Sequence, residues 1–333
     1  MSEESLGEES RIFTITQKDR EDFKRLDQYL NYKIEEYSRN FLKNLFDNDL
    51  IELNSDSPNP HIKLELKKMP PEGTIVQVNI PPPLPAEAEA ENIPLEILFE
   101  DEHLVFVNKP AGMVTHPAPG NYRGTLVNAI LFHCKDLKGV GDQKRPGIVH
   151  RLDKGTSGVM VVAKNQKCHE LLVGLFSKHD LERRYQALAI NRPQVTAGHL
   201  ESMIGRHPQN RLKMTTQLTR GKLAITDYKV LELFHKASLL EMKLETGRTH
   251  QIRVHLKELL KTPIINDPLY GHPNDDKRIL GAAAAAAIGS YEHPYLHAKV
   301  LGFVHPMTQK PMHFESPLPP EFQQLLNVLR EEP

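Results

Sequence analysis

The feature that most constrains the fold is a polar, glycine-punctuated turn that leads directly into an apolar run. Residues 147–158 read GIVHRLDKGTSG, and the VMVVA that follows occupies residues 159–163. A short, uninterrupted apolar stretch predicts a buried strand, and the glycines predict a tight loop before it. The sequence thus places one carboxylate, Asp153, among basic and hydroxyl side chains beside a rigid strand. Folds commonly present reactive groups in this way.

Length and composition predict a soluble chain with more than one domain. The chain has 333 residues, of which 39% are hydrophobic and 26% are charged. This length exceeds one small core and predicts two or three domains. Residues 1–10 are acidic and polar, so we expect a disordered tail rather than a signal peptide. The small-residue run at 282–287 is too short to span a bilayer. We therefore expect a cytoplasmic protein, without a membrane partner, that is a monomer.

The cysteines and histidines give no sign of a metal site. The two cysteines, Cys134 and Cys168, cannot make a disulfide framework and have no ligand-like spacing. None of the 17 histidines pairs with a cysteine at such a spacing or lies in a His-Glu-x-x-His pattern. We expect no metal and no cofactor, and free thiols in a reducing compartment.

One segment is locally basic although the net charge is only −1. Residues 202–223 contain no acidic residue, and their basic side chains are Arg206, His207, Arg211, Lys213, Arg220 and Lys222. Phosphate binding responds to such local patches rather than to the net charge. The segment therefore indicates a nucleic-acid partner, and the alternative is an ordinary solvated basic surface.

Residues 11–80 predict a small separate domain. Apolar residues recur at helical spacing from Phe23 to Ile34, and a second helix is expected after the N-cap Ser38. Short strands are expected at 51–53, 62–64 and 74–80. The order and the motifs Arg25-Leu26-Asp27 and Ser38-Arg39-Asn40 resemble the S-four-like (alpha-L) RNA-binding domain. This resemblance implies RNA contacts at Arg25 and Arg39. Acidic residues at 47–57 depart from that pattern, and a helical cap on the larger domain is the alternative.

The rest of the chain predicts an α+β domain. Prolines and glutamates at 81–93 predict a stiff linker, because proline fixes φ and lacks a donor. Residues 94–325 follow, then a tail at 326–333. Strands are expected at 95–99, 104–107, 159–163, 185–190, 224–231 and 239–244. Helices are expected after the caps Asn165 and Thr249, with Leu171 and Leu259 among their inward residues. Without strict βα alternation, a mixed or largely antiparallel sheet flanked by helices is favoured. The alanines at 282–287 favour helix and receive no function.

Three motifs in 94–325 resemble the RluA-type pseudouridine synthases, close to the RluD/RluC branch. They are His150-Arg151-Leu152-Asp153-x-x-Thr156-Ser157-Gly158, Arg183-Arg184-Tyr185-x-Ala187, and Gly247-Arg248-Thr249-His250-Gln251-Ile252-Arg253-Val254-His255. The resemblance implies that Asp153 is the catalytic nucleophile or base, that Arg253 pairs with it, and that Tyr185 stacks on the target uracil. Ile265-Asn266-Asp267 replaces a typical V-G-D, and asparagine tolerates the positive φ of such a turn.

The family resemblance also implies the RNA contacts. Arg151 matches the arginine that fills the gap left by a flipped-out base. Lys154 and the basic side chains of Arg206, Arg211, Lys213 and Lys222 would contact RNA. The function implied is isomerisation of uridine in structured RNA, with large-subunit ribosomal RNA, free or in pre-ribosomal particles, as the substrate. A transfer RNA substrate and an inactive RNA-binding protein of the same fold remain alternatives. A hydrolase would need a second carboxylate.

Overall fold

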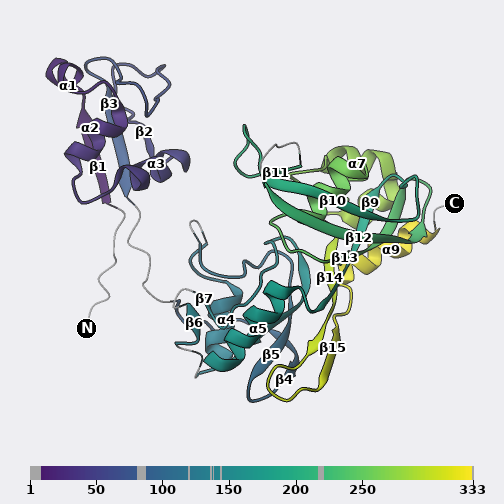
Figure 1. The fold of residues 1–333 in the computed structure, drawn as a ribbon. Coiled ribbons are helices and arrows are strands. Elements are labelled where there is room, and N and C mark those ends of the chain that lie inside the picture. Colours follow the sequence, from purple (N-terminus) through teal and green to yellow (C-terminus); the bar gives the residue numbers. More distant parts are fainter. Residues whose placement is uncertain are drawn as a thin grey trace. The chain divides into compact units, whose positions relative to one another are not determined.

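The computed structural model describes residues 9–80, 88–118, 121–135, 137, 139–142, 145–216 and 221–331. The chain divides into two compact units, Met1–Leu84 and Pro85–Pro333 (Figure 1). Three parts of the sequence predictions lie outside the described residues: residues 1–8 of the expected tail, the prolines of the expected linker at 81–87, and Arg220.

The N-terminal unit is a small α/β layer. Its antiparallel sheet has the order β1-β3-β2, and the helices pack a core that includes Leu26, Leu30 and Leu42 against it. The helix after Ser38 begins as predicted, because the Ser38 hydroxyl accepts a hydrogen bond from the Phe41 N–H. The elements are β1 (Glu9–Thr14), α1 (Gln17–Asp22), α2 (Leu26–Lys33), α3 (Arg39–Asp47), β2 (Ile51–Leu53) and β3 (Ile75–Ile80).

Two expectations for this unit are wrong. Residues 62–64 form no strand, because the chain turns at 60–61 and the Ile62 N–H donates to the Asn59 carbonyl oxygen instead of to a neighbouring strand. The strand β1 begins at Glu9, inside the expected tail, since Glu9 pairs with Ile80 of β3.

The second unit is built on a ten-stranded sheet with the order β11-β10-β12-β13-β9-β14-β8-β5-β4, and β15 pairs with β14. The pair β8–β14 is parallel and the other named pairs are antiparallel, so the predicted α+β fold with a mixed, largely antiparallel sheet is confirmed. The strands are β4 (Glu96–Glu100), β5 (Leu104–Lys109), β8 (Ser157–Ala163), β9 (Glu182–Ile190), β10 (Ala197–Arg206), β11 (Met214–Thr215), β12 (Lys222–Leu233), β13 (Ala237–Leu244), β14 (Leu296–Val304) and β15 (Pro311–Glu315); a separate ribbon joins β6 (Gly141–Asp142) to β7 (Arg145–Pro146).

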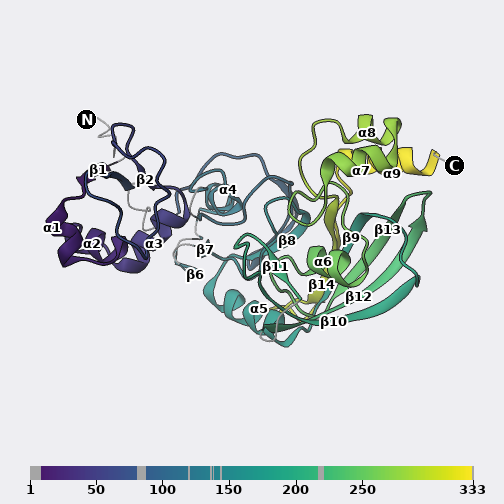
Figure 2. The ribbon, with the colours of Figure 1, turned by 90° about the horizontal axis from the view of Figure 1, so that it is seen from above.

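Helices cover the sheet at its two ends. The helix α5 packs on β8, while α7, α8 and α9 pack together at the other end (Figure 2). The alanine run forms α8 and buries Ala284. The helices are α4 (Leu126–His133), α5 (Gln166–Lys178), α6 (Gln251–Val254), which continues into the π-turn η1 (His255–Leu259), α7 (Pro273–Leu280), α8 (Ala282–Ile288) and α9 (Pro320–Glu331).

The two expected helix caps have different outcomes. Asn165 caps α5 by accepting from the Cys168 N–H, as predicted, but Leu171 is exposed. Thr249 does not cap α6; the N-cap is His250, which has a left-handed φ of 56°. The Gln251 side chain closes this turn instead, accepting from the Arg248 N–H at 2.9 Å. The change to π geometry at residue 255 leaves Leu259 exposed rather than inward.

Both expected boundaries of the large domain need correction. Residues 88–93 are not a free linker, because the Glu91 N–H donates to the Asn128 carbonyl oxygen and Ala88 packs on the core. At the other end, α9 runs to Glu331 and buries Leu326 and Leu329. Residues 326–331, which were expected to be a tail, are therefore the last turns of a packed amphipathic helix. None of the helices described is long and apolar enough to cross a membrane.

Two fully buried histidines predict sensitivity to acid. Burial lowers the pKa of His255 and of His297 to about 4. The unfolded chain then binds more protons between pH 4 and about 6.5, so the stability that these neutral rings confer is lost as the pH falls through that window. Each histidine should cost about 2 kcal/mol at pH 5 relative to pH 7.5.

Urea denaturation at pH 7.5 and pH 5 measures this effect. The variant H297Q, whose side chain does not titrate, should lose about 2 kcal/mol less than the wild type between the two pH values. Equal pH dependence in both proteins would contradict the assignment of His297 as a buried neutral group.

Candidate active site

Asp153 lies in a loop that is tied down on both sides. The Leu152 carbonyl oxygen accepts from the buried Thr115 hydroxyl at 2.9 Å, and the Lys154 carbonyl oxygen accepts from the Gly112 N–H at 2.8 Å. The Thr156 N–H closes a turn on the Asp153 carbonyl oxygen at 3.0 Å. These bonds fix the backbone around Asp153, so its carboxylate is pre-positioned.

The end of this loop is fixed by the parallel pairing of β8 with β14. His297 pairs with Ser157, and Ala298 pairs with Gly158. Gly158 has a φ of 119°, and a Cβ there would lie 2.2 Å from the Ala298 carbonyl oxygen. Only glycine permits this close approach, which explains the last residue of the H-R-L-D-x-x-T-S-G pattern.

A buried lysine, Lys109, binds backbone carbonyl oxygens of the segment that packs against the Asp153 loop. Lys109 is fully buried, and its Nζ donates to the carbonyl oxygens of Pro110 and Met113 at 2.9 Å. Burial lowers the pKa of Lys109 to about 7, although the charge of Asp153 opposes the shift.

Asp153 lines a cavity of about 550 Å³. Its carboxylate is 18% exposed and lies 3.3 Å from Nη1 of Arg253. The other edge of the same guanidinium donates to Asp267, from Nε at 2.7 Å and from Nη2 at 2.8 Å. Burial alone would lower the pKa of Arg253, but its hydrogen bonds with Asp267 raise it. Arg253 is therefore a permanently charged bridge between a cavity carboxylate and a buried one.

A second chain of contacts reaches Asp153 through His250. The His250 Nε2 lies 3.8 Å from Asp153 Oδ2, while its Nδ1 lies 2.8 Å from the Tyr270 hydroxyl. That hydroxyl also accepts from the Met214 N–H at 2.7 Å. When the hydroxyl donates its own proton to Nδ1, the proton of the neutral ring lies on Nε2. The Tyr270 ring also packs 5.0 Å from the Arg253 guanidinium. Burial lowers the pKa of His250, which favours this neutral form.

Tyr185 comes from β9 and faces the same cavity. It is 9% exposed, and burial raises the pKa of its phenol, so its hydroxyl stays protonated. His150 lies in the same loop as Asp153, and its ring stacks on Phe176 and accepts from the Val161 N–H at 3.1 Å. Burial lowers the pKa of His150 to about 3, so this ring is neutral.

The predicted RNA contacts are distributed over several places. Arg151 is exposed and lines the Asp153 cavity, whereas Lys154 points to Asn121 and does not line it. Lys213 lines a second cavity of about 450 Å³, behind Tyr270.

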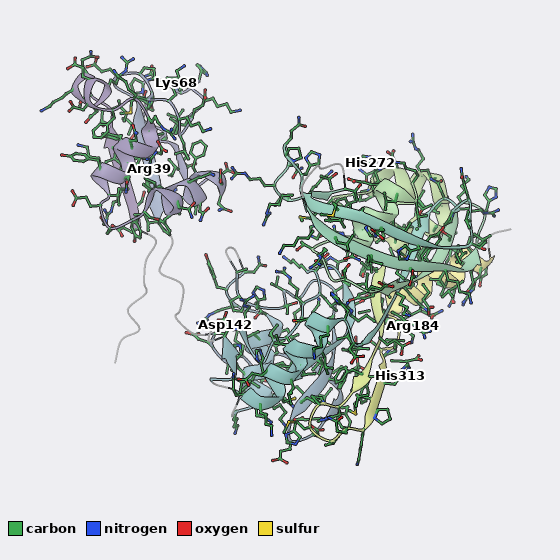
Figure 3. All side chains as sticks on the ribbon, viewed as in Figure 1. Arg39, Lys68, Asp142, Arg184, His272 and His313 are labelled. Atoms are coloured by element: carbon green, nitrogen blue, oxygen red, sulfur yellow. The ribbon has the colours of Figure 1, made fainter. Side chains whose placement is uncertain are left out.

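Within the second unit, Arg206, Arg211 and Lys222 line neither cavity. Arg206 donates to the Arg211 carbonyl oxygen across the turn between β10 and β11, and Lys222 opens β12. In the N-terminal unit, Arg25 and Arg39 both bind the carboxylate of Asp27 (Figure 3 labels Arg39).

Sequence reasoning missed Asp267 and Tyr270 as parts of the site. The signal for Asp267 was present, because it ends the Ile265-Asn266-Asp267 segment that replaces V-G-D. Asn266 does adopt a left-handed φ of 62°, as its residue type permits. Two potential metal-ligand clusters, Glu100/His133/Cys134 and His199/Asp227/Glu245, were also missed, and neither lines the cavity.

Comparison with known proteins decides the family. Residues 103–258 match the RNA pseudouridylate synthase family. Over 307 residues the chain is 42% identical to the ribosomal large subunit pseudouridine synthase D of Zymomonas mobilis, covering 92% of this chain and 93% of that protein. The chain belongs to the RluA-type RNA pseudouridine synthases. It is therefore an isomerase that acts on RNA.

Two further relatives are similar to this pseudouridine synthase. An uncharacterised RNA pseudouridine synthase of Bacillus subtilis is 39% identical, covering 95% of this chain and 98% of that protein. The structure of human RNA pseudouridylate synthase domain containing 4 aligns with a TM-score of 0.55 at 28% identity, over 71% of this chain and 93% of that one.

The buried Arg253–Asp267 pair predicts a large stability cost for D267N. Asp267 is fully buried and also accepts from the N–H groups of Leu269 and Tyr270. Removal of its charge leaves buried Arg253 with Asp153 alone, at 3.3 Å, so the unfolding free energy should fall by about 3 kcal/mol.

Urea denaturation compares D267N with D275N. Asp275 pairs with Arg278 on the surface of α7, where the side chains are 53% and 80% exposed, so D275N should cost under about 1 kcal/mol. Similar costs for the two variants would contradict the structural importance of the buried bridge.

Proposed function

We propose that this enzyme isomerises uridines of large-subunit ribosomal RNA, with Asp153 as the reacting carboxylate. The observation that carries the catalytic part is the pairing of the cavity-facing Asp153 with Arg253, itself anchored on Asp267. The ribosomal substrate is supported by the names of several relatives that are 42–45% identical, including proteins of Zymomonas mobilis and Neisseria meningitidis.

Isomerisation requires an anionic oxygen at the sugar of a uridine. The glycosidic bond to nitrogen 1 breaks, the base turns while still held, and its carbon 5 bonds to the ribose. Carbon 5 then loses its hydrogen as a proton, nitrogen 1 gains a proton, and Asp153 is regenerated. The Asp153 carboxylate either attacks the ribose carbon or removes a proton from the neighbouring sugar carbon. Both routes use the same ionised oxygen in the same place, and the bridge through Arg253 keeps it there.

The cavity suits a nucleotide that has left its helix. Tyr185 offers an apolar ring on which a uracil stacks, an interaction that contributes about 1–3 kcal/mol per base. Arg151 is exposed at the cavity and can occupy the space that the flipped base vacates in the RNA. Together these contacts offset the few kcal/mol of stacking and pairing that base flipping costs.

The titratable side chains His150 and Tyr185 near Asp153 are uncharged, so Asp153 is the reacting group that carries a negative charge. His150 is neutral, and Tyr185 keeps its proton. The Nε2 of His250 lies 3.8 Å from Asp153 Oδ2, beyond hydrogen-bond distance, at the wall of the cavity that would hold the substrate. A hydrolase would need a second free carboxylate at this place. Among the described residues that line the cavity, Asp153 is the only acid.

Substitution of the proposed nucleophile tests the catalytic part. D153N should abolish hydrogen release from carbon 5 of labelled uridine in RNA, by at least about 10³-fold, while RNA binding persists. The surface variant D275N is the matched control and should keep full activity. Hydrogen release by D153N would reject Asp153 as the reacting group, and release of free uracil by the wild type would indicate a hydrolase.

A variant of the bridging arginine tests its pairing role. R253M removes the cation beside Asp153 and should lower turnover by about 10²-fold or more, because the carboxylate loses its partner. A melting curve and RNA binding measured on the same preparation separate this effect from misfolding. An unchanged rate in folded R253M would contradict the proposal.

The RNA substrate is tested in cells. Pseudouridine maps of ribosomal and transfer RNA, made with and without this gene, should differ at uridines of the large-subunit RNA. Expression of D153N should not restore the missing sites, whereas D275N should. Loss of sites in transfer RNA alone would overturn the ribosomal assignment and leave the isomerase activity intact.

A further inference from the structure

A second buried arginine faces the cavity, and within the described residues no carboxylate pairs with it. Arg183 lies two residues before Tyr185 on β9, and the two side chains share one face of the strand. It is only 7% exposed. Its Nη2 donates to the Glu245 carbonyl oxygen at 2.8 Å, and its buried Nε has no hydrogen-bond partner.

Comparison with Arg253 shows why this arrangement is unusual. Arg253 is equally buried, but two carboxylates compensate its charge. In the described part of the chain no carboxylate pairs with Arg183, and burial lowers the pKa of Arg183. A buried cation is costly unless an anion accompanies it. The wall of the cavity therefore carries a buried guanidinium, that of Arg183, whose charge no described carboxylate compensates.

The surroundings of Arg183 are positive and open to a ligand. Arg248, His179 and Ser177 line the same cavity. A Cβ on Gly247 would lie 2.9 Å from Arg183 Nη1, so the glycine leaves room for the guanidinium. Asp153 is occupied by its own arginine and is no partner for this group.

We propose that Arg183, with Arg248 beside it, forms a subsite for a phosphodiester of the flipped-out uridine. This inference rests on the proposed function, because it places the base of that uridine on Tyr185. Uracil and ribose are uncharged, so the phosphates are the groups of the substrate that can compensate the guanidinium. Arginine binds phosphate through a planar fork of N–H donors. The subsite would hold the backbone while the base turns.

Binding of small probes tests the subsite without turnover. Isothermal calorimetry at low salt compares uridine 3′,5′-bisphosphate with uridine on the full-length protein. The wild type should bind the bisphosphate about tenfold to a hundredfold more tightly, as expected for charge-assisted hydrogen bonds. R183M should lose that preference.

Arg184 provides the matched control. It lies next in the chain and points to the opposite face, where it pairs with Glu182 and Glu241 at the surface (Figure 3). R184M should keep the full preference for the bisphosphate. Should R183M lose its cooperative melt, R183Q takes its place, because it removes the charge and keeps an N–H for the Glu245 carbonyl oxygen.

Two results would overturn the subsite: a wild type that binds both probes equally, or a folded Arg183 variant that keeps the preference. The proposed function fails separately. D153N should keep the bisphosphate preference while it loses hydrogen release. A wild type that shows an Arg183-dependent preference yet converts no uridine in RNA would retain the subsite and reject the proposed function.

Discussion

The active site depends on one guanidinium held between two carboxylates. Arg253 binds the buried Asp267 with its Nε and Nη2, and approaches Asp153 with its Nη1. The planar fork of arginine makes this division possible, because it offers donors on two edges at once. Asp267 therefore fixes the direction of the arginine, and the arginine fixes the carboxylate in the cavity. The buried pair is costly to desolvate, which makes sense where position matters more than stability.

The rest of the fold brings the two halves of that bridge together. Asp153 is delivered by the loop before β8, and Arg253 by the short helix α6, which follows β13. The central strands β9 and β14 lie between these elements in the sheet. The tight β8–β14 contact at Gly158 fixes the end of the Asp153 loop, and the left-handed turn at His250 fixes the start of the helix that carries Arg253. The cavity is thus made by segments about 100 residues apart, as the separation of Asp153 and Arg253 shows.

The periodicity of apolar residues predicted the strands and the core more reliably than it predicted where helices begin and end. The uninterrupted VMVVA run became β8, buried at every position. The Asn165 cap was correct because its side-chain oxygen needs only a local N–H. The Thr249 cap failed because Gln251 satisfies that turn from within the helix. Residues 326–331 looked like a tail, yet leucines at helical spacing dock them as the end of α9.

By itself, the sequence determined the α+β class and the small N-terminal unit, and its family resemblance singled out Asp153, Tyr185 and Arg253 as candidate reactive side chains. Local patterns sufficed for these, because a motif records residue types at short spacing. Only the tertiary structure decided which charges are compensated. Asp267 became the anchor of Arg253, while Arg183 has no carboxylate partner among the residues that the structure describes. Such pairing depends on distances between segments that are remote in the chain, and no local pattern encodes those distances.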